Sequence, residues 1–251
     1  MTSEGLLAGE RVLVTGGSGG LGRGICEVAA REGAKVAFVW KSNAAGAGET
    51  EAALRALGAE VLSIQADLTQ PQAAQEVVAQ VEAAWEGIDG LVNNAGFSEA
   101  VPFVLLEDED LQALLELNLM APFRLTRAAV RGMLRRKHGR IVNLSSITGS
   151  RTIPGPVHYA TSKGALEAFT RSLAHEVGAY GILVNAVAAG IFEGGLKSTI
   201  PEHHQQRYLN ACSLGRFGTP AECGELVCWL LSRRNGYLNG TVVYQEGGTL
   251  G

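Results

Sequence analysis

Short apolar runs rich in β-branched residues alternate along the chain with longer stretches in which apolar residues recur at helical spacing. The short runs predict strands over residues 11–15, 35–40, 60–65, 90–92, 140–144, 182–187 and 241–244. The longer stretches predict helices over residues 21–31, 71–85, 108–136, 157–177 and 221–231, and an alanine-rich helix that ends near residue 57. Strand and helix therefore alternate strictly, which is typical of a sheet built from strand–helix–strand units.

Several of the predicted strands, residues 11–15 and 35–40 among them, are apolar at nearly every position. A strand of this kind is buried on both faces, as in a parallel sheet covered by helices. No linker rich in proline or serine divides the chain. The sequence therefore predicts a single doubly wound α/β domain over residues 1–251, with a mostly parallel sheet of about seven strands and helices on both faces.

Residues 189–217 form the one long stretch without clear periodicity. Long irregular segments in compact domains often serve as lids or binding loops. We therefore predict that this segment forms a substrate lid. The alternative is a poorly periodic helix that packs locally.

Composition narrows the classes of function. Hydrophobic residues make up 46% of the 251 residues, and 21 basic against 25 acidic residues give a net charge of −4, which argues against a binder of nucleic acid or anionic lipid. Without a signal-peptide pattern or ~18 consecutive apolar residues, we expect a cytoplasmic protein with no membrane contact. The cysteines show no metal-finger spacing, and we expect them to be reduced packing residues; they are Cys26, Cys212, Cys223 and Cys228.

A glycine-rich turn, residues 15–22, joins the first predicted strand to the first helix. Glycine permits positive φ and lets backbone N–H groups approach a pyrophosphate, whose charge the helix N-terminus favours. The pattern Gly17-x-Gly19-x-x-Gly22 fits a dinucleotide-binding loop, and a purely structural glycine turn is the alternative. The candidate cofactor contacts here are Gly16, Ser18, Gly19, Gly20, Leu21 and Gly22.

The second predicted strand ends in Trp40, Lys41 and Ser42, where a dinucleotide-binding fold that prefers NAD carries an acid for the ribose 2′-hydroxyl. Because no carboxylate repels a 2′-phosphate here, and a cation and a hydroxyl can meet it, we expect NADP(H) to be preferred over NAD(H). Trp40 is placed to stack on the adenine. The alternative for Lys41 is a merely solvated side chain.

Tyr159 and Lys163 stand four residues apart on one face of a predicted helix. A nearby cation favours the phenolate and lowers a tyrosine pKa from its ordinary value of about 10, which suits the pair to proton transfer. Tyr-x-x-x-Lys alone is common on amphipathic helices. Here Ser145-Ser146 and Asn93-Asn94-Ala95-Gly96 also follow strands, so they meet the glycine loop at the carboxyl edge of the sheet, where ligands bind.

With these motifs in this order, the sequence resembles the short-chain dehydrogenase/reductase family over essentially its whole length, which implies a Rossmann fold and an NADP-dependent oxidoreductase. The matching motifs are Thr15-Gly16-x-x-x-Gly20-x-Gly22, Asn93-Asn94-Ala95-Gly96, the serine-bearing strand end and Tyr159-x-x-x-Lys163. The family's serine lies 13 residues before its tyrosine, which selects Ser146 over Ser145.

The resemblance implies a role for each candidate catalytic residue. Tyr159 donates a proton to the substrate oxygen during reduction, and Lys163 tunes Tyr159 and binds the nicotinamide ribose. Ser146 hydrogen-bonds the carbonyl, Asn118 holds a water for proton relay, and the nicotinamide supplies the hydride. The further cofactor contacts are Asp67, Leu68, Asn94, Ala95, Gly96, Gly190 and Phe192. Asp67 could equally cap the following helix.

The segment after the sixth predicted strand departs from the family pattern. Ala189 replaces the usual proline, and Gly194 stands where a threonine usually meets the nicotinamide carboxamide. We expect a looser lid and one hydroxyl contact fewer. Activity is expected to remain, because backbone groups at Ile191 and Phe192 can reach the carboxamide.

Within the family, residues 139–146 and 239–248 look most like the 3-oxoacyl-[acyl-carrier-protein] reductase group. We therefore expect reduction of a 3-oxoacyl thioester, linked to a carrier protein or to coenzyme A, in fatty-acid or polyketide-type synthesis. A basic run could dock an acidic acyl carrier protein, or could serve only the helix macrodipole: Arg131, Arg135, Arg136, Lys137 and Arg140. Against docking, Tyr180 stands where the group's second docking arginine is expected.

Two other functions stay open: a reductase or dehydrogenase of a free alcohol or ketone, and a nucleotide-sensing protein without turnover. We expect no catalytic metal, because His138, His158 and His175 lack ligand spacing and the adjacent His203 and His204 should point apart on a helix. The resemblance implies a homotetramer, or a homodimer, through helices 108–136 and 157–177.

Overall fold

The computed structural model describes residues 5–151 and 155–249; the other residues of the predicted domain lie outside the described part. Seven parallel strands form one sheet in the order β3-β2-β1-β4-β5-β6-β7. Their bounds are β1 Arg11–Thr15, β2 Lys35–Trp40, β3 Val61–Gln65, β4 Gly90–Asn93, β5 Gly139–Ser146, β6 Ile182–Ala189 and β7 Val242–Gln245. The predicted doubly wound α/β fold is confirmed.

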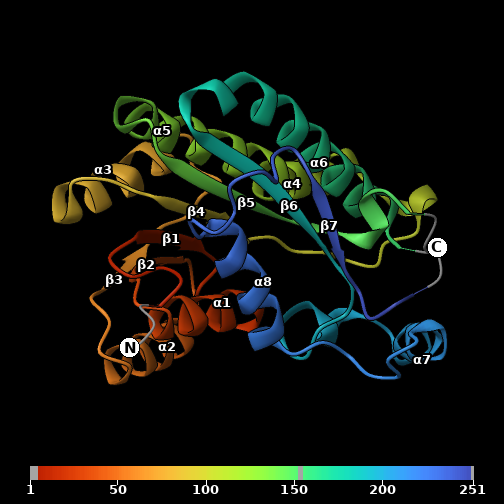
Figure 1. The fold of residues 1–251 in the computed structure, drawn as a ribbon. Coiled ribbons are helices and arrows are strands. Elements are labelled where there is room, and N and C mark those ends of the chain that lie inside the picture. The colour runs from red at the N-terminus through yellow and green to blue at the C-terminus, as the bar shows by residue number, and fades with distance from the viewer. Residues whose placement is uncertain (1–4, 152–154, 250–251) are drawn as a thin grey trace.

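Helices cover both faces of the sheet (Figure 1). The α-helices are α1 Gly20–Arg31, α2 Ala44–Ala56, α3 Ala73–Trp85, α4 Asp108–Leu115, α5 Ala121–Arg136, α6 Val157–Val177, α7 Glu202–Ala211 and α8 Pro220–Leu231. Short 3-10 turns are η1 Phe103–Leu105, η3 Ile147–Gly149, η4 Gly178–Tyr180 and η5 Gly195–Thr199. In the described ranges, no helix is both long and apolar enough to cross a membrane.

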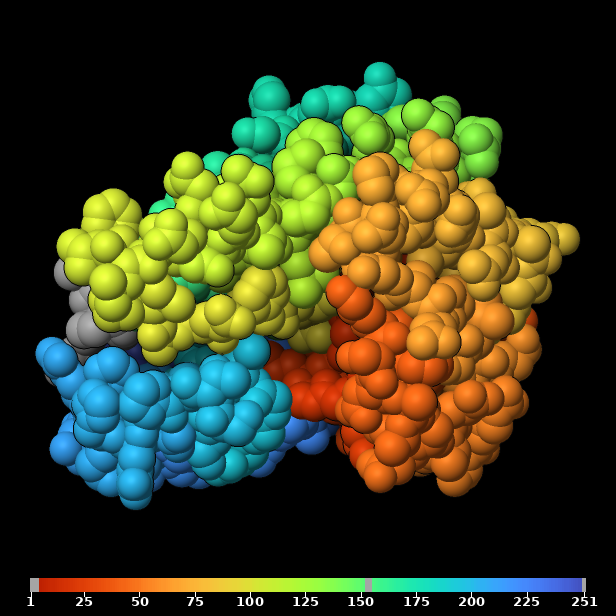
Figure 2. Space-filling view, turned by 180° about the vertical axis from the view of Figure 1, so that it is seen from behind, coloured from red at the N-terminus to blue at the C-terminus, as the bar shows by residue number. Residues whose placement is uncertain are grey.

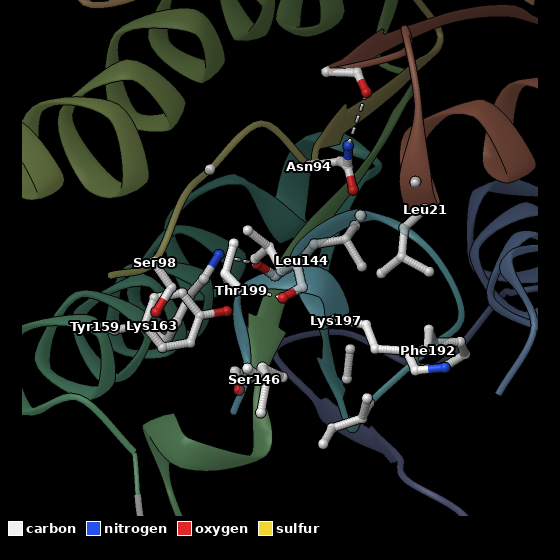
Figure 3. Close-up of a pocket in the computed structure, with 18 of the residues that line it drawn as sticks. Leu21, Asn94, Ser98, Leu144, Ser146, Tyr159, Lys163, Phe192, Lys197 and Thr199 are labelled. Carbon is white, nitrogen blue, oxygen red and sulfur yellow. Dashed lines mark hydrogen bonds between the residues drawn. The ribbon is translucent and has the colours of Figure 1, made fainter. Parts of the chain in front are cut away.

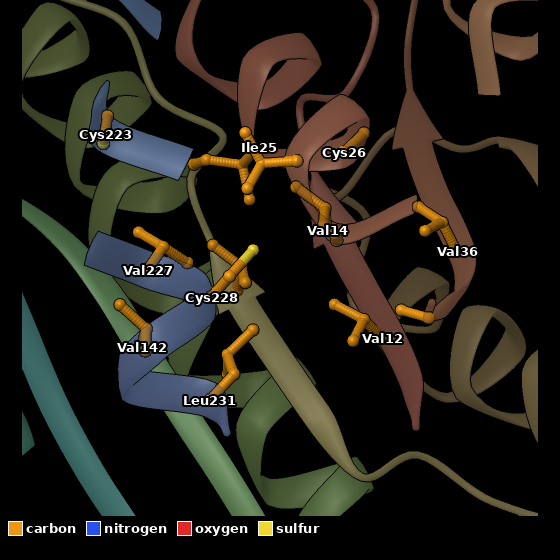
Figure 4. Packing of buried hydrophobic residues seen from close by; sticks show 14 of the residues in the cluster. Val12, Val14, Ile25, Cys26, Val36, Val142, Cys223, Val227, Cys228 and Leu231 are labelled. Carbon is orange, nitrogen blue, oxygen red and sulfur yellow. The ribbon is translucent and has the colours of Figure 1, made fainter. Parts of the chain in front are cut away.

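Two buried apolar clusters form the core, one on each face of the sheet. On one face, α1 and α8 pack across the middle strands, with Ile25 and Val227 meeting side chains such as Val14 and Val142 (Figure 4). On the other face, α3, α5 and α6 cover the same strands. All four cysteines are free and buried, as expected, and burial raises the pKa of the Cys26 thiol.

The predicted helix over 108–136 is wrong as a single element. A π-helical turn, η2 Glu116–Met120, separates α4 from α5. This wide turn contains Asn118, whose fully buried side chain hydrogen-bonds both backbone groups of Phe97. The break between α4 and α5 therefore coincides with the contact between Asn118 and Phe97, and the spacing of apolar residues does not reveal this break.

The stretch without periodicity contains secondary structure of its own. Residues 195–199 form η5 and residues 202–211 form α7, while β6 extends to Ala189 because it pairs with β5 as far as Ser146. A locally packed, weakly periodic helix is thus present within 189–217.

Candidate active site

A cavity of about 1180 Å³ runs along the carboxyl edge of the sheet. It opens as a cleft between the α7 region, light blue, and the segment before α4, yellow, and the red N-terminal strand region lies at its inner end (Figure 2). Ligand pockets typically measure roughly 300–1,000 Å³. The cavity therefore has room for a dinucleotide and a second molecule together.

The glycine loop packs against neighbouring backbone. Gly16 has a φ of 71°, and a Cβ added at Gly22 would lie 2.1 Å from the carbonyl oxygen of Gly16. Helix α1 begins without a side-chain cap and without an acid in its first turn, so its N-terminal N–H groups can meet an anion. Of the predicted loop contacts, Gly22 alone does not line the cavity, since it is buried beneath the loop.

Thr15 fixes the end of β4 against the end of β1. Its hydroxyl accepts hydrogen bonds from the backbone N–H groups of Asn94 and Ala95, each at 2.9 Å. The Asn94 side chain donates to the carbonyl of Thr15 at 2.8 Å. This brings Asn94, Ala95 and Gly96 to the cavity wall. In the sequence, Thr15 is visible only as part of the glycine motif.

At the end of β2, Trp40 and Lys41 line the cavity, whereas Ser42 does not. The Trp40 indole donates to Ser63 at 3.0 Å, and Lys41 pairs with Asp67 at 2.9 Å. Although burial raises the pKa of Asp67, hydrogen bonds from Lys41 and Thr69 lower it, so the net pKa lies below its ordinary value.

Asp67 accepts from Thr69 and not from α3, so it does not cap the helix that follows. Leu68 also lines the cavity. Sequence reasoning missed Asn43, which lines the cavity, caps α2 and donates to the backbone of Ser18. An Asn just before an alanine-rich helix is the signal that could have revealed it.

Tyr159 and Lys163 lie one turn apart on α6, with the Lys163 Nζ 5.6 Å from the Tyr159 ring centroid. Figure 3 shows Lys163 reaching the Leu144 carbonyl, to which it donates at 2.7 Å, with Tyr159 beside it. Lys163 is only 5% exposed. The two side chains thus face the cavity together, at the end of β5.

The expected lowering of the Tyr159 pKa is wrong for this structure. Burial raises the pKa of Tyr159 to about 12, and a hydrogen bond with Ser146 offsets only part of that rise. Burial also lowers the pKa of Lys163 to about 8. The Lys163 ammonium lies 5.6 Å from the Tyr159 ring centroid and donates to the Leu144 carbonyl.

The two serines at the end of β5 are held differently. Ser146 Oγ accepts hydrogen bonds from the Thr148 hydroxyl at 3.0 Å and from the Thr148 backbone N–H at 3.3 Å. Ser145 instead donates to Glu167 at 2.8 Å, and Ser150 donates to the same carboxylate oxygen at 3.2 Å. Glu167, 1% exposed on α6, thus ties the strand end and η3 to the helix of Tyr159. Sequence reasoning missed it.

Asn118 is fully buried and does not line the cavity. Its Oδ1 accepts from the Phe97 N–H at 3.0 Å, and its Nδ2 donates to the Phe97 carbonyl at 2.9 Å. Nδ2 also donates to Ser162 at 3.3 Å. The Asn118 side chain therefore holds the segment after β4 in place. Its amide oxygen and nitrogen already have hydrogen-bond partners in the protein.

Residues between 190 and 211 form a second wall of the cavity. Gly190 and Phe192 line the cavity, and Phe192 pairs with Gly218 in an isolated bridge. Gly194 and Gly195 have φ values of 74° and 53°, so a threonine at 194 would be strained. A Cβ added at Gly20 would lie 3.0 Å from the Gly195 Cα. This wall therefore touches the glycine loop directly.

The basic run is not a continuous surface. Arg136 donates to the Ile88 carbonyl, and Arg140 donates to the carbonyls of Gly139 and Gly181. Burial lowers the pKa of both guanidinium groups. These two side chains therefore bond the fold itself, and of the basic run Arg131, Arg135 and Lys137 are exposed.

One expectation about the histidines is wrong. The rings of His203 and His204 do not point apart, since their centroids lie 4.2 Å from each other, and His204 lines the cavity. His138 lies with Glu10 and Asp89, whose ligand atoms are all within 4.8 Å of one another. Arg11 forms an ion pair with Asp89, and Arg233 forms one with Glu10. The group is therefore a charge-balanced network.

A family model described as enoyl-(acyl carrier protein) reductase matches residues 16–249. The chain is 35% identical to nodulation protein G of Rhizobium sp. (strain N33) and 33% identical to the 3-oxoacyl-[acyl-carrier-protein] reductase FabG of Escherichia coli (strain K12). Each alignment covers 96% of this chain and 97% of the relative.

Two solved structures of short-chain dehydrogenases are also similar to this chain. A short-chain dehydrogenase/reductase from Serratia marcescens BCRC 10948 is 32% identical, with a TM-score of 0.90. A short chain dehydrogenase from Burkholderia cenocepacia J2315, in complex with NADP, is 33% identical, also with a TM-score of 0.90. Both comparisons cover 97% of this chain and 98% of the other.

Proposed function

Since the chain belongs to the short-chain dehydrogenase/reductase family and is an oxidoreductase, we propose that it reduces the 3-oxo group of an acyl thioester with NADPH. The thioester is linked to an acyl carrier protein or to coenzyme A, and the product is the 3-hydroxyacyl thioester. One observation carries this proposal: the side chains of Ser146, Tyr159 and Lys163 converge in a cavity that also contains the glycine loop. The FabG relatives, named for this reaction, support it.

The residues present fit NADP(H). The uncapped start of α1 suits a pyrophosphate, and no acid ends β2, where Lys41 offers a cation to a 2′-phosphate. The NADP bound to the Burkholderia relative supports the same choice. When bound, the nicotinamide supplies a hydride to the carbonyl carbon.

Tyr159 and Ser146 handle the substrate oxygen. With a pKa near 12, the Tyr159 phenol is protonated at neutral pH and can donate its proton to the carbonyl oxygen as negative charge develops there. The Ser146 hydroxyl donates a second hydrogen bond to the same oxygen. Lys163, whose pKa is about 8, is mostly an ammonium at pH 7 and can balance the phenolate that forms.

Carbonyl reduction is favoured over the alkene reduction named by the matched family model. The FabG relatives, which are named for reduction of a 3-oxoacyl group, support reduction of the carbonyl. We further propose that residues 189–217 act as the substrate lid. The homotetramer stays a prediction.

The test follows NADPH absorbance with acetoacetyl and crotonyl thioesters, with and without acyl carrier protein. We expect oxidation of NADPH by the acetoacetyl thioester, faster than oxidation of NADH, and a loss of about 10²–10⁴-fold in Tyr159→Phe. Enhancement by the carrier would identify the partner. No turnover of either thioester, with NADPH still bound, would contradict the proposal and lead to a panel of free ketones and alcohols. Turnover of none of these would leave a nucleotide sensor.

A further inference from the structure

The substrate side of the cavity has a cation without a counter-ion. The lysine, arginine and acidic side chains that line the cavity are Lys41, Asp67, Lys163, Lys197 and Arg207. Lys41 pairs with Asp67 at 2.9 Å, Lys197 pairs with Glu193 at 2.6 Å, and Lys163 donates to a backbone carbonyl. Arg207 makes no ion pair and no hydrogen bond with its side chain to any residue within 5–151 or 155–249.

Helix α7 holds Arg207 in a defined place. The next residue, Tyr208, is 9% exposed, stacks on Phe217 and donates to the Glu246 carbonyl at 2.7 Å. Gln205 donates to the Ile200 carbonyl at 2.8 Å. Because α7 is anchored in this way, Arg207 stands on a fixed helix at the cavity wall, with His204 one turn earlier on the same face.

The charges of the cavity favour an anion at this wall. Asp67 is the one acid among the described lining residues, and it is already paired at the nucleotide end. Near Arg207 the lining is neutral or apolar, with side chains such as Ile200 and Ala211. A guanidinium in such a cleft binds phosphate oxygens in a bidentate manner, which a lysine cannot do.

We propose that Arg207, with His204 beside it, binds the phosphate of the 4′-phosphopantetheine arm that carries the acyl thioester. This inference rests on the proposed function and deepens it. It assigns recognition of the arm to α7, whose residues His204 and Arg207 line the cavity. The phosphate is common to coenzyme A and to an acyl carrier protein, so either can supply it.

The first test measures binding without turnover. 4′-Phosphopantetheine and pantetheine, which differ by one phosphate, are titrated calorimetrically into the NADP⁺-loaded protein. We expect the phosphate to strengthen binding about fivefold in the wild type, which is roughly 1 kcal/mol, and this ratio to fall to about one in Arg207→Gln. Arg234→Gln, an exposed arginine outside the cavity, serves as the matched control and should keep the wild-type ratio. An unchanged ratio in Arg207→Gln would overturn the proposal.

The second test separates the sources of the phosphate. KM is compared for acetoacetyl coenzyme A, acetoacetyl carrier protein and the neutral N-acetylcysteamine thioester. A rise of about fivefold in Arg207→Gln for both phosphate-bearing substrates, relative to the neutral one, supports the shared phosphate contact. A rise for coenzyme A alone assigns the contact to its nucleotide phosphates and contradicts the proposal. If no thioester is reduced, the proposed function fails, and the calorimetric ratio still decides whether Arg207 binds phosphate.

Discussion

The two sides of the cavity are built in opposite ways. On the nucleotide side, backbone packs on backbone: a Cβ at Gly22 would meet the Gly16 carbonyl, and one hydroxyl of Thr15 fixes two N–H groups of the neighbouring strand end. On the substrate side, α7 is attached through a small cluster that includes Tyr208 and Cys212, and most of its other side chains are exposed.

This difference separates what the fold must keep from what it can vary. Glycines whose Cβ would collide with backbone cannot change without moving the sheet edge. The exposed face of α7 can change its side chains without loss of core packing. We therefore expect changes on the nucleotide side to affect folding and cofactor binding together, and changes on the exposed face of α7 to affect mainly the proposed lid.

The largest effect is expected from Gly22→Ala on the nucleotide side. The added Cβ would lie 2.1 Å from a backbone oxygen, so α1 must shift, at a cost of about 3 kcal/mol in the free energy of unfolding. NADPH binding should weaken with it. Gly48→Ala is the matched control, because nothing lies within 4 Å of its Cβ position on exposed α2, and it should stabilise by about 0.5–1 kcal/mol. Urea unfolding measures both, and equal effects would refute the packing argument.

Acid is expected to have the next largest effect, through the ion pair of Arg11 and Asp89 at the amino ends of β1 and β4. Burial raises the pKa of Asp89, but hydrogen bonds from the Arg11 side chain and backbone, with side-chain contacts at 2.7 Å, lower it below its ordinary value. A lowered pKa in the folded state means that this stabilisation is complete above about pH 4 and is lost as the pH falls through the folded-state pKa.

Asp89→Asn tests the same network. The variant should lose about 2–3 kcal/mol at pH 7, because it leaves Arg11 without its charged partner. The difference from the wild type should shrink below pH 4. Unfolding curves at several pH values measure this, and a difference that does not depend on pH would show that charge is not the cause.

Substitutions of Glu167 test how the end of β5 is positioned against α6. Its carboxylate holds Ser145 and Ser150, and thereby the Ser146 strand end, against the helix that carries Tyr159. We expect Glu167→Ala to lower kcat about 10- to 30-fold, and Glu167→Gln, which still accepts hydrogen bonds, to recover most of that loss. If both variants lose only stability and keep kcat, the residue has no positioning role.

The smallest effect is expected on the substrate side. Tyr208→Phe removes the hydrogen bond to the Glu246 carbonyl and should cost about 1 kcal/mol of local stability. Because α7 then holds its cavity face less firmly, KM for the thioester should rise about threefold while KM for NADPH stays the same. Steady-state kinetics with each substrate varied in turn measures this. An equal rise in both KM values would mean that the two sides are not independent.

Sequence patterns predicted the elements well where structure is local. The alternation of apolar runs and helical periods places the seven strands to within a few residues. The central strands are buried along nearly their whole length, and this burial is visible as continuous apolar runs in the sequence. The glycine loop and the pair formed by Tyr159 and Lys163 are local as well, since one turn or one helix face brings their residues together.

The rest depended on contacts between distant segments. Asn118 lies in a π turn and anchors Phe97, His138 meets Glu10 across the sheet, and Glu167 supports a strand end that lies 22 residues away. The rise in the Tyr159 pKa follows from burial and from where Lys163 points, and spacing along a helix reports neither.

The sequence by itself therefore determined the α/β fold, the family, the nucleotide loop and the residue types that face the carboxyl edge of the sheet, because each is encoded by short-range periodicity or spacing. The tertiary structure decided the direction of the pKa shifts, the residues that support Ser146 and the pairing state of every cation in the cavity. The interaction energy of two charged groups depends on the distance between them in space. Side chains that are far apart along the chain come close to each other only in the folded protein.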